Sequence, residues 1–309
     1  RGSYASVGTP IPRNLSIATY PFDAGGGAWG TNTYRPIDEL KPEKTNSWEA
    51  GLSTKFWGNR LSIDFTWYKS NTKNQTLEIP ISASSGYTSM YIQTGDIQNT
   101  GIELTVGSEN KFGDLTWSSS FTATHNQNKI VQLMDGEFYD PQGQLITNPE
   151  YLGKGGVGST EFRLYKGGTM GDLYTKNKLK RNEDGTMYLS ESGQPVLENE
   201  LEKAGSVLPK WNLGFRNDFY YKNINFGFLI SARSGGVVAS TTQAIMDGYG
   251  VSKASAIARD NANDKGLTMI EGTMVRPKDY YDVTGQAQGL MSNYIYKANN
   301  VRLQEVSIG

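Results

Sequence analysis

Residues 61–69 of this 309-residue chain read LSIDFTWYK, and their pattern is the strongest indication of its fold. Positions 61, 63, 65 and 67 carry Leu, Ile, Phe and Trp, whereas positions 62, 64, 66 and 68 carry Ser, Asp, Thr and Tyr. Successive side chains of a β-strand point to opposite faces, so this alternation predicts a strand with one apolar face and one polar face. Gly58 and Asn59, just before it, predict a tight turn from a preceding strand.

The same alternation recurs along the whole chain. We expect strands over residues 2–8, 45–57, 61–69, 97–109, 115–126, 209–221, 224–231 and 294–309. In the last of these the alternation slips by one position at Gln304 and Glu305, which indicates a β-bulge. Residues 252–263 have modest helical character within the connection before it. Because the first and last strands start and stop inside alternating sequence, we expect the chain to be part of a longer protein.

The connections between these strands are alternately long and short. In chain order they measure about 36, 4, 21, 5, 80, 2 and 60 residues. Tight turns at one end of a meander and long loops at the other are typical of an outer-membrane barrel. No run of about 18 apolar residues occurs, which excludes a spanning helix. Since only helices and closed barrels satisfy every backbone amide in lipid, the pattern favours a transmembrane β-barrel.

The composition agrees with strands that show only every second side chain to an apolar medium. Hydrophobic residues make up 37% of the chain, while 36 glycines and 18 tyrosines are present. The formal net charge of −1 gives no support for nucleic-acid binding. Cysteine is absent, which excludes disulfides and thiolate metal sites. A soluble or surface-exposed all-β glycan-binding module remains the alternative to a barrel.

The barrel interpretation assigns each strand face to a medium. Side chains expected to face lipid include Leu61, Ile63, Phe65 and Trp67, while Ser62, Asp64 and Thr66 are expected to face the lumen. Other charged residues expected in the lumen are Glu49, Lys55, Glu103, Arg216 and Asp218. Aromatic residues beside the tight turns are expected to form the periplasmic-side girdle at headgroup level. They are Phe56, Trp57, Phe112, Trp117, Phe219, Tyr220 and Tyr221.

Catalytic and metal-binding patterns are weak, and we expect no enzyme activity, metal or cofactor. His125 is the only histidine and has no nucleophile context, so a polar surface position is favoured. Residues 153–158, GKGGVG, lack the Lys-Ser/Thr of a phosphate loop, which favours a flexible loop. Residues 181–186, RNEDGT, predict a hairpin turn, because their carboxylates are too few and wrongly spaced for a calcium loop.

Five segments carry a more specific signal. They are SYASVG at 3–8, LKPEKTNSWEAG at 40–51, NTGIEL at 99–104, LPKWNLG at 208–214 and VRLQEVSIG at 301–309. In their order and spacing they resemble the C-terminal barrel of the SusC/RagA family of TonB-linked outer-membrane proteins. The stretch at 40–51 is the most telling because it is long and its spacing is fixed.

The resemblance implies that residues 1–309 belong to a single receptor barrel domain. About eight of its roughly 22 strands would lie here, with long extracellular loops, while the plug and N-terminal domains would be absent from this chain. It also implies import of glycan or peptide fragments across the outer membrane of a Gram-negative, Bacteroidetes-like bacterium. A SusD-like lipoprotein would act as a lid, and the TonB complex would act through the missing N-terminal part.

Candidate binding residues lie in the first two long loops. Aromatic side chains in flexible polar loops suit stacking on sugar rings or peptide side chains, and equally suit contact with a lid. Packing of the loops on themselves is the alternative. The candidates are Tyr20, Phe22, Trp29 and Tyr34 in the first loop and Tyr87 and Tyr91 in the second.

Overall fold

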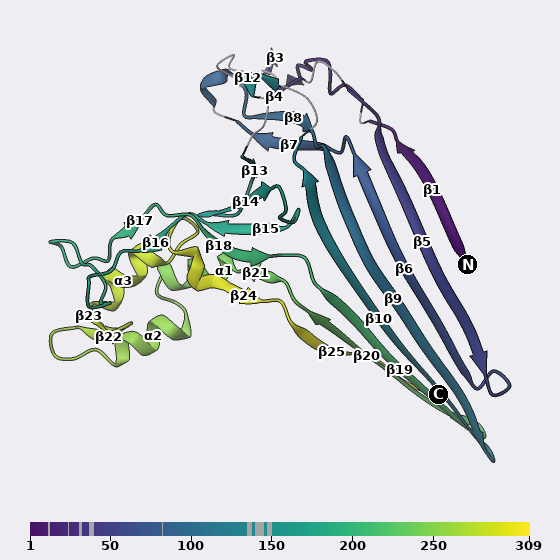
Figure 1. The fold of residues 1–309 in the computed structure, drawn as a ribbon. Coiled ribbons are helices and arrows are strands. Elements are labelled where there is room, and N and C mark those ends of the chain that lie inside the picture. Colours follow the sequence, from purple (N-terminus) through teal and green to yellow (C-terminus); the bar gives the residue numbers. More distant parts are fainter. Residues whose placement is uncertain are drawn as a thin grey trace.

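The computed structural model describes residues 1–11, 13–23, 25–30, 33–36, 40–81, 83–134, 138–139, 145–146 and 150–309. Its largest element is an antiparallel sheet of eight strands, in which each strand pairs with the next one along the chain (Figure 1). The strands are β1 (Gly2–Thr9), β5 (Glu43–Phe56), β6 (Leu61–Lys73), β9 (Asp96–Phe112), β10 (Leu115–Gln132), β19 (Trp211–Tyr221), β20 (Ile224–Ser234) and β25 (Asn300–Ile308). The expected eight-stranded meander is confirmed.

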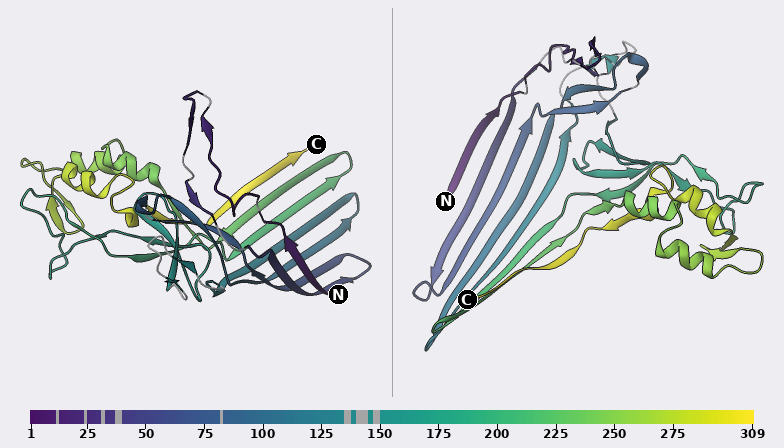
Figure 2. Two further views of the ribbon diagram at one scale, coloured as in Figure 1. Left: turned by 90° about the horizontal axis from the view of Figure 1, so that it is seen from above. Right: turned by 180° about the vertical axis from the view of Figure 1, so that it is seen from behind.

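Tight turns join the strands at one end of the sheet. Gly58 and Asn59 between β5 and β6 have φ of 66° and 71°, Gly113 between β9 and β10 has φ of 62°, and Lys222 between β19 and β20 has φ of 53°. This left-handed backbone matches the twist of a short hairpin, which is why Gly and Asn were informative in the sequence. The other connections are long and gather at the opposite end (Figures 1 and 2). We call them the first (10–42), second (74–95), third (133–210) and fourth (235–299) loops.

The pairing register places apolar side chains of all the neighbouring strands on one face. One cross-strand row runs Leu52, Phe65, Leu104, Ala123, Leu213, Ala232 and Val301. The row beside it, on the opposite face, runs Ser53, Asp64, Thr105, Thr122, Gly214, Ser231 and Arg302. The apolar side chains stay exposed, with Leu52 at 61% and Val301 at 74% of their full exposure. This face therefore requires an apolar medium outside the chain.

The predicted β-bulge is confirmed in β25. Leu229 pairs with Glu305 and Ile230 with Leu303, so Gln304 is the extra residue. The bulge restores the alternation, because Val306 and Ile308 return to the apolar face opposite Phe228 and Phe226. The single strand expected over 294–309 is wrong in its first part. There, β24 (Ile295–Lys297) leaves the sheet and pairs with β21 (Val237–Ala239) instead.

Most of the aromatic residues expected in the girdle lie on the apolar face beside the tight turns. The register places Phe56, Phe112, Trp117, Phe219 and Tyr221 on the apolar face near the tight turns. The rings of Trp117 and Phe219 stack with centroids 6.2 Å apart, and Trp117 Nε1 donates to Asn217 Oδ1 at 3.0 Å. The prediction for Tyr220 is wrong. Tyr220 lies on the polar face, because successive side chains of β19 alternate and its neighbours Phe219 and Tyr221 lie on the apolar face. Trp57 lies in the turn itself, with φ of 51°.

His125 does not lie on a polar surface. It shares the apolar face with its cross-strand partners Ile102 and Trp211, and its ring centroid lies 4.7 Å from that of Trp211. This position is at the loop end of β10, opposite the girdle. The difference arises because its place in the strand register, rather than its polarity, decides which face it shares.

Most of the buried core lies among the loops, where they pack against the loop ends of β9 and β10. Its largest cluster joins Ile97 and Ile130 of β9 and β10 to the second and third loops. Ile130 is fully buried. β10 was expected to end at residue 126 but continues to Gln132, because its loop end packs against protein. A second cluster joins Leu179 and Met187 of the third loop to Tyr280 of the fourth.

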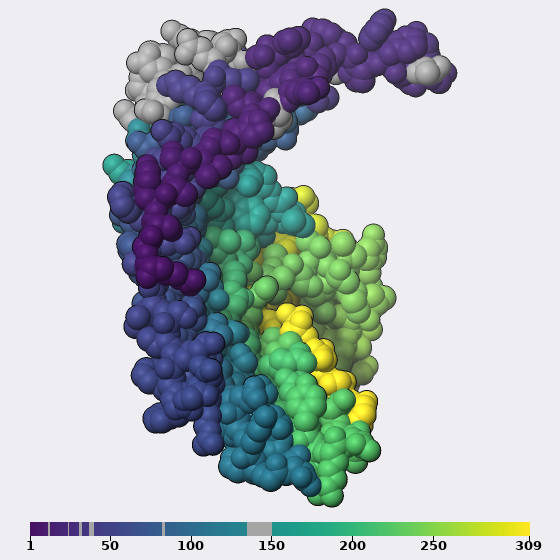
Figure 3. Space-filling view, turned by 90° about the vertical axis from the view of Figure 1, so that its right-hand side faces the viewer, coloured from purple at the N-terminus to yellow at the C-terminus, as the bar shows by residue number. Residues whose placement is uncertain are grey.

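The loops contain short elements of their own. The first holds β2 (Phe22–Asp23), β3 (Ala28–Trp29) and β4 (Tyr34–Arg35), and the second holds β7 (Thr76–Pro80), η1 (Ala83–Ser85) and β8 (Ser89–Gln93). The third holds β11 (Phe138–Tyr139), β12 (Leu145–Ile146), β13 (Tyr151–Lys154), β14 (Thr160–Tyr165), β15 (Asp172–Thr175), β16 (Lys178–Leu179), β17 (Leu197–Glu198) and β18 (Glu202–Ser206). Figure 3 shows the first loop, in purple, extending beyond the rest of the molecule.

The fourth loop contains the α-helices of the described residues. They are α1 (Thr241–Gly248), α2 (Lys253–Asp260) and α3 (Pro277–Thr284), followed by η2 (Met291–Tyr294) and accompanied by the hairpin of β22 (Thr268–Ile270) and β23 (Thr273–Val275). Ser240 and Ser252 cap α1 and α2 through their side chains, and Pro277 opens α3. The helical character expected at 252–263 is confirmed by α2. Among the described residues, none of the helices has the length and hydropathy that crossing a membrane requires.

A charge on the apolar face should destabilise the folded protein. Phe65→Lys in the full-length protein is expected to cost about 2–4 kcal/mol of folding free energy if the side chain lies near the bilayer midplane. The matched control is Thr105→Lys, which adds the same charge on the polar face, beside Asp64. Urea titration of folding into liposomes measures both. An equal or larger loss for Thr105→Lys would mean that the two faces are reversed.

Candidate functional site

The first two loops are joined by a short parallel bridge. β4 pairs with β8, with Tyr34 opposite Ser89 and Arg35 opposite Met90. This pairing brings Tyr34 and Tyr91 together, 57 positions apart in sequence, in an edge-to-face contact with ring centroids 5.4 Å apart. Two of the six candidate aromatics are therefore neighbours, although they come from different loops.

Tyr34 and Tyr91 are held by the packing of the loops themselves. The Tyr34 hydroxyl lies 2.9 Å from the carbonyl oxygen of Asn14 and 3.1 Å from that of Ile17. The Tyr91 hydroxyl donates to Glu78 Oε2 at 3.4 Å, and burial together with Glu78 raises the pKa of Tyr91. Tyr87 is half-buried, and its backbone N–H donates to Ser85 Oγ. The side chains of Tyr34 and Tyr91 therefore support the loop structure, and Tyr87 takes part through its backbone.

The other three candidates are exposed on the first loop. Phe22 and Trp29 face each other across the β2–β3 hairpin, with ring centroids 4.9 Å apart, and keep 54% and 71% of their full exposure. Asp23 closes this hairpin by accepting from the backbone N–H groups of Gly25 and Gly27. Tyr20 is also exposed. The six candidates thus form two groups. Tyr20, Phe22 and Trp29 are exposed, whereas Tyr34, Tyr87 and Tyr91 lie where the first loop meets the second.

The glycine-rich stretch at 153–158 forms a joint between the third and fourth loops. Gly158 has φ of 64°, and a Cβ there would lie 2.0 Å from the carbonyl oxygen of Ala287. Ser159 donates from its backbone N–H to Ala287 O at 2.8 Å and from its hydroxyl to Gly289 O at 2.7 Å. The close approach explains why glycine is required. The C-terminal end of the stretch expected to be a flexible loop is thus anchored to the fourth loop by the adjacent Ser159, while residues 154–157 are exposed.

The hairpin turn at 181–186 is confirmed. Arg181 and Met187 form an antiparallel bridge, and Gly185 has φ of 85°. Asp184 Oδ1 accepts from the backbone N–H of Thr186 at 2.9 Å and from its hydroxyl at 2.6 Å. These hydrogen bonds hold the pKa of Asp184 below its usual value. In the part of the chain that the structure describes, no group of three or more His, Cys, Asp or Glu side chains could hold a metal ion.

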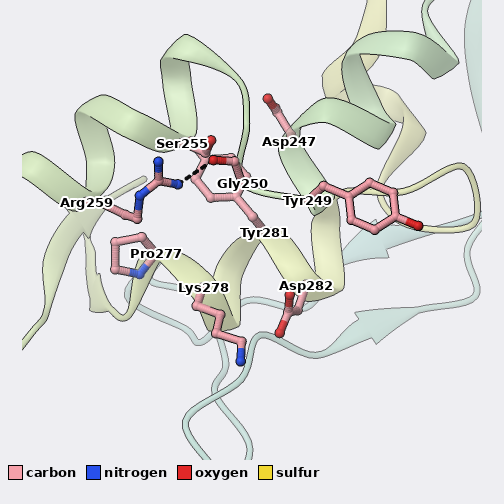
Figure 4. Close-up of a pocket in the computed structure, with 10 residues that line it drawn as sticks. Asp247, Tyr249, Gly250, Ser255, Arg259, Pro277, Lys278, Tyr281 and Asp282 are labelled. Atoms are coloured by element: carbon pink, nitrogen blue, oxygen red, sulfur yellow. Dashed lines mark hydrogen bonds between the residues drawn. The ribbon is translucent and has the colours of Figure 1, made fainter.

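A cavity of about 240 Å³ lies between α1, α2 and α3 of the fourth loop (Figure 4). The buried Asp247 accepts from Tyr294 Oη at 3.0 Å and from Gln243 Nε2 at 2.9 Å, and burial together with Asp247 raises the pKa of Tyr294. On the other side, Arg259 Nη1 donates to Gly250 O at 2.6 Å. No sequence motif predicted this cavity, because its lining comes from three short helices and their connections, which only the tertiary fold brings together.

Comparison with known proteins decides the family. A family model described as "TonB dependent receptor-like, beta-barrel" matches residues 1–255. The chain belongs to this family. Its members are receptors and transporters of the Gram-negative outer membrane and are not enzymes. The resemblance in the sequence and the barrel expectation are thereby confirmed.

Curated relatives agree with this assignment. TonB-dependent receptor P3 of Formosa agariphila is 27% identical over 292 residues, which cover 88% of this chain and 27% of that protein. TonB-dependent receptor SusC of Bacteroides thetaiotaomicron is 27% identical over 236 residues, which cover 71% of this chain and 22% of that protein. The chain therefore spans about a quarter of the length of these relatives. In fold, it is similar to the RagAB peptide transporter, with a TM-score of 0.68, 17% identity, and coverage of 100% of this chain and 34% of that one.

Gly158→Ala should open the joint between the third and fourth loops. The new Cβ would collide with Ala287, and the positive φ adds about 1–2 kcal/mol of strain. Gly167→Ala is the matched control, because Gly167 also has a positive φ but has nothing within 4 Å of a Cβ. Hydrogen–deuterium exchange in the full-length protein should show faster exchange at Ser159 only for Gly158→Ala. Equal exchange in the two variants would contradict the joint.

Proposed function

We propose that this chain is a barrel segment of a TonB-dependent outer-membrane importer of glycan or peptide fragments. The importer would work with a SusD-like surface lipoprotein as its lid. The single observation that supports this most is the eight-stranded meander with one exposed apolar face, one polar face and its long loops at one end. Lipid, an aqueous lumen and an outer surface are the three environments that such a sheet fits.

The apolar face disfavours the alternative of a soluble glycan-binding module. A soluble sandwich would bury such a face against a second sheet. The described core instead lies among the loops, and the large side chains of the sheet, such as Leu52 and Val301, remain exposed. An exposed apolar surface that crosses seven neighbouring strands is far larger than single exposed residues on an ordinary soluble protein.

The polar face suits a water-filled interior that a plug can enter. Arg216 lies between Asp218, 2.8 Å away, and Glu305, 3.1 Å away, while Asp64 pairs with Arg1 at 3.0 Å. These charges are partly exposed and need water or another charged surface beside them. In this proposal the plug and the segment that contacts TonB belong to the remaining length that the relatives have. β1 and β25, at the two edges of the sheet, would pair with further strands of the same barrel.

The exposed aromatics of the first loop suit recognition. Phe22 and Trp29 pack on each other across the β2–β3 hairpin, which lies at the far end of the molecule from the tight turns (Figure 1). Aromatic side chains contribute large contact areas, whether the partner is cargo or the lid. Tyr20 would extend this surface. Tyr34, Tyr87 and Tyr91, the remaining candidates, would act by holding the loops that present it.

Uptake by the full-length protein tests the proposal. Cells expressing it should accumulate labelled oligosaccharides or peptides, and accumulation should stop when TonB is deleted. The protein should be recovered in the outer membrane and should require detergent for extraction. Extraction into aqueous buffer without detergent would contradict the barrel, and uptake that persists without TonB would contradict energised import.

Removing the exposed pair should weaken recognition. Phe22→Ala/Trp29→Ala is expected to reduce affinity for cargo or for the lid lipoprotein by about tenfold, because aromatic anchors dominate such interfaces. Trp57→Ala is the control, since Trp57 is equally exposed but lies in a tight turn at the opposite end of the sheet. Titration of both partners against the purified protein measures the effect. Unchanged affinity for both partners would remove this pair from the site.

A further inference from the structure

The cavity of the fourth loop is a second candidate site, separate from the aromatic pair of the first loop. We propose that it binds one neutral sugar ring of a glycan chain. The cavity lies at the C-terminal end of α1, between α2 and α3. Figure 4 shows Arg259, Pro277 and Tyr281 among its lining residues, together with Lys278 and Asp282. All of its lining residues belong to a single loop.

The charges around the cavity favour a neutral ligand with many hydroxyl groups. Two cations, Arg259 and Lys278, and two anions, Asp247 and Asp282, line it. An anionic ligand would meet the two carboxylates, and a cationic one would meet the guanidinium and the ammonium. Sugar hydroxyls can donate to the Asp282 carboxylate and accept from Arg259 and Lys278 at the same time. Both oxygens of Asp247 already accept from Tyr294 and Gln243, so Asp247 contributes its charge alone.

Lys278 and Asp282 are placed unfavourably for the stability of α3. Lys278 lies in the first turn and Asp282 in the last, and the helix dipole disfavours a cation at the first and an anion at the second. Within the described residues, neither side chain has a hydrogen-bonding or ion-pairing partner of its own, and both are exposed. The pair therefore contributes little to folding, and a ligand supplies the partners that the protein does not.

The floor and the size of the cavity fit one ring. Tyr281 and Pro277 give it an apolar surface on which the C–H face of a pyranose can stack, as aromatic and apolar side chains do in many binding sites. Its volume of about 240 Å³ is below the roughly 300–1,000 Å³ of sites that enclose drug-sized molecules. One sugar would enter, and the rest of the chain would remain in solvent.

The walls are fixed before a ligand arrives. Asp247 is anchored by Tyr294 and Gln243, and the hydrogen bond from Arg259 to Gly250 O ties α2 to the end of α1. Ala244 and Met291, both fully buried, pack α1 against η2. Such pre-organisation reduces the entropic cost of binding. Binding of a sugar in this cavity does not require that the protein imports it.

Binding by the full-length protein, purified in a detergent without a sugar head group, tests the proposal. The probes are an array of neutral α- and β-linked hexose oligosaccharides, with hexagalacturonate and trialanine as charged comparisons. Wild-type protein is expected to bind a neutral oligosaccharide, and Lys278→Ala/Asp282→Ala to weaken that binding by about tenfold. Asp264→Ala/Lys265→Ala removes the same two charges from an exposed segment outside the cavity and should leave affinity unchanged.

The outcomes separate the site from the import function. Absence of binding across the neutral array would overturn the proposal, and so would equal affinity in the two double variants. Preference for hexagalacturonate or trialanine would overturn the assigned ligand class. Loss of uptake with intact oligosaccharide binding would instead count against import alone. Circular dichroism of the variants confirms that both retain the fold.

Discussion

The need to pair the backbone amides of every strand with those of its neighbours determines the architecture of the eight-stranded sheet. Lipid offers no hydrogen bonds, so a chain that enters it must pair each strand with its neighbours. Antiparallel pairing in turn fixes the register, and the register sorts side chains into an apolar row through Phe65 and a polar row through Asp64. The single register shift of β25 at Gln304 preserves this sorting.

This constraint explains why so much of the barrel could be predicted from sequence. Where a strand has a different medium on each face, polarity alternates with every residue, and Leu61 to Trp67 show it without interruption. The turn residues Gly58, Asn59 and Gly113 indicated where the neighbouring strands end. The predicted faces of Tyr220 and His125 were wrong, because the polarity of these two residues does not indicate their face. Tyr220 is amphipathic and lies on the polar face, whereas His125 is polar and lies on the apolar face.

The structure of the loops depends on contacts between distant segments, and less of it could be predicted from the sequence. Their core forms between segments far apart in the chain, as when Ile97 and Ile130 pack with the second and third loops. Local hydrophobic periodicity therefore does not predict it. The contact of Tyr34 with Tyr91 depends on the parallel bridge of β4 and β8, which joins two loops. The cavity of the fourth loop likewise exists only after three helices pack together. Thus the candidate aromatics could be named in advance, but their division into exposed and packed groups could not.

Alternate residues of β6 should face lipid and lumen. Nitroxide labels placed singly at positions 61–67 of the full-length protein, reconstituted in liposomes, test this arrangement through their accessibility to oxygen and to a water-soluble nickel chelate. We expect high oxygen accessibility at 61, 63, 65 and 67 and high chelate accessibility at 62, 64 and 66. The opposite phase, or uniform access of the chelate along the strand, would contradict it.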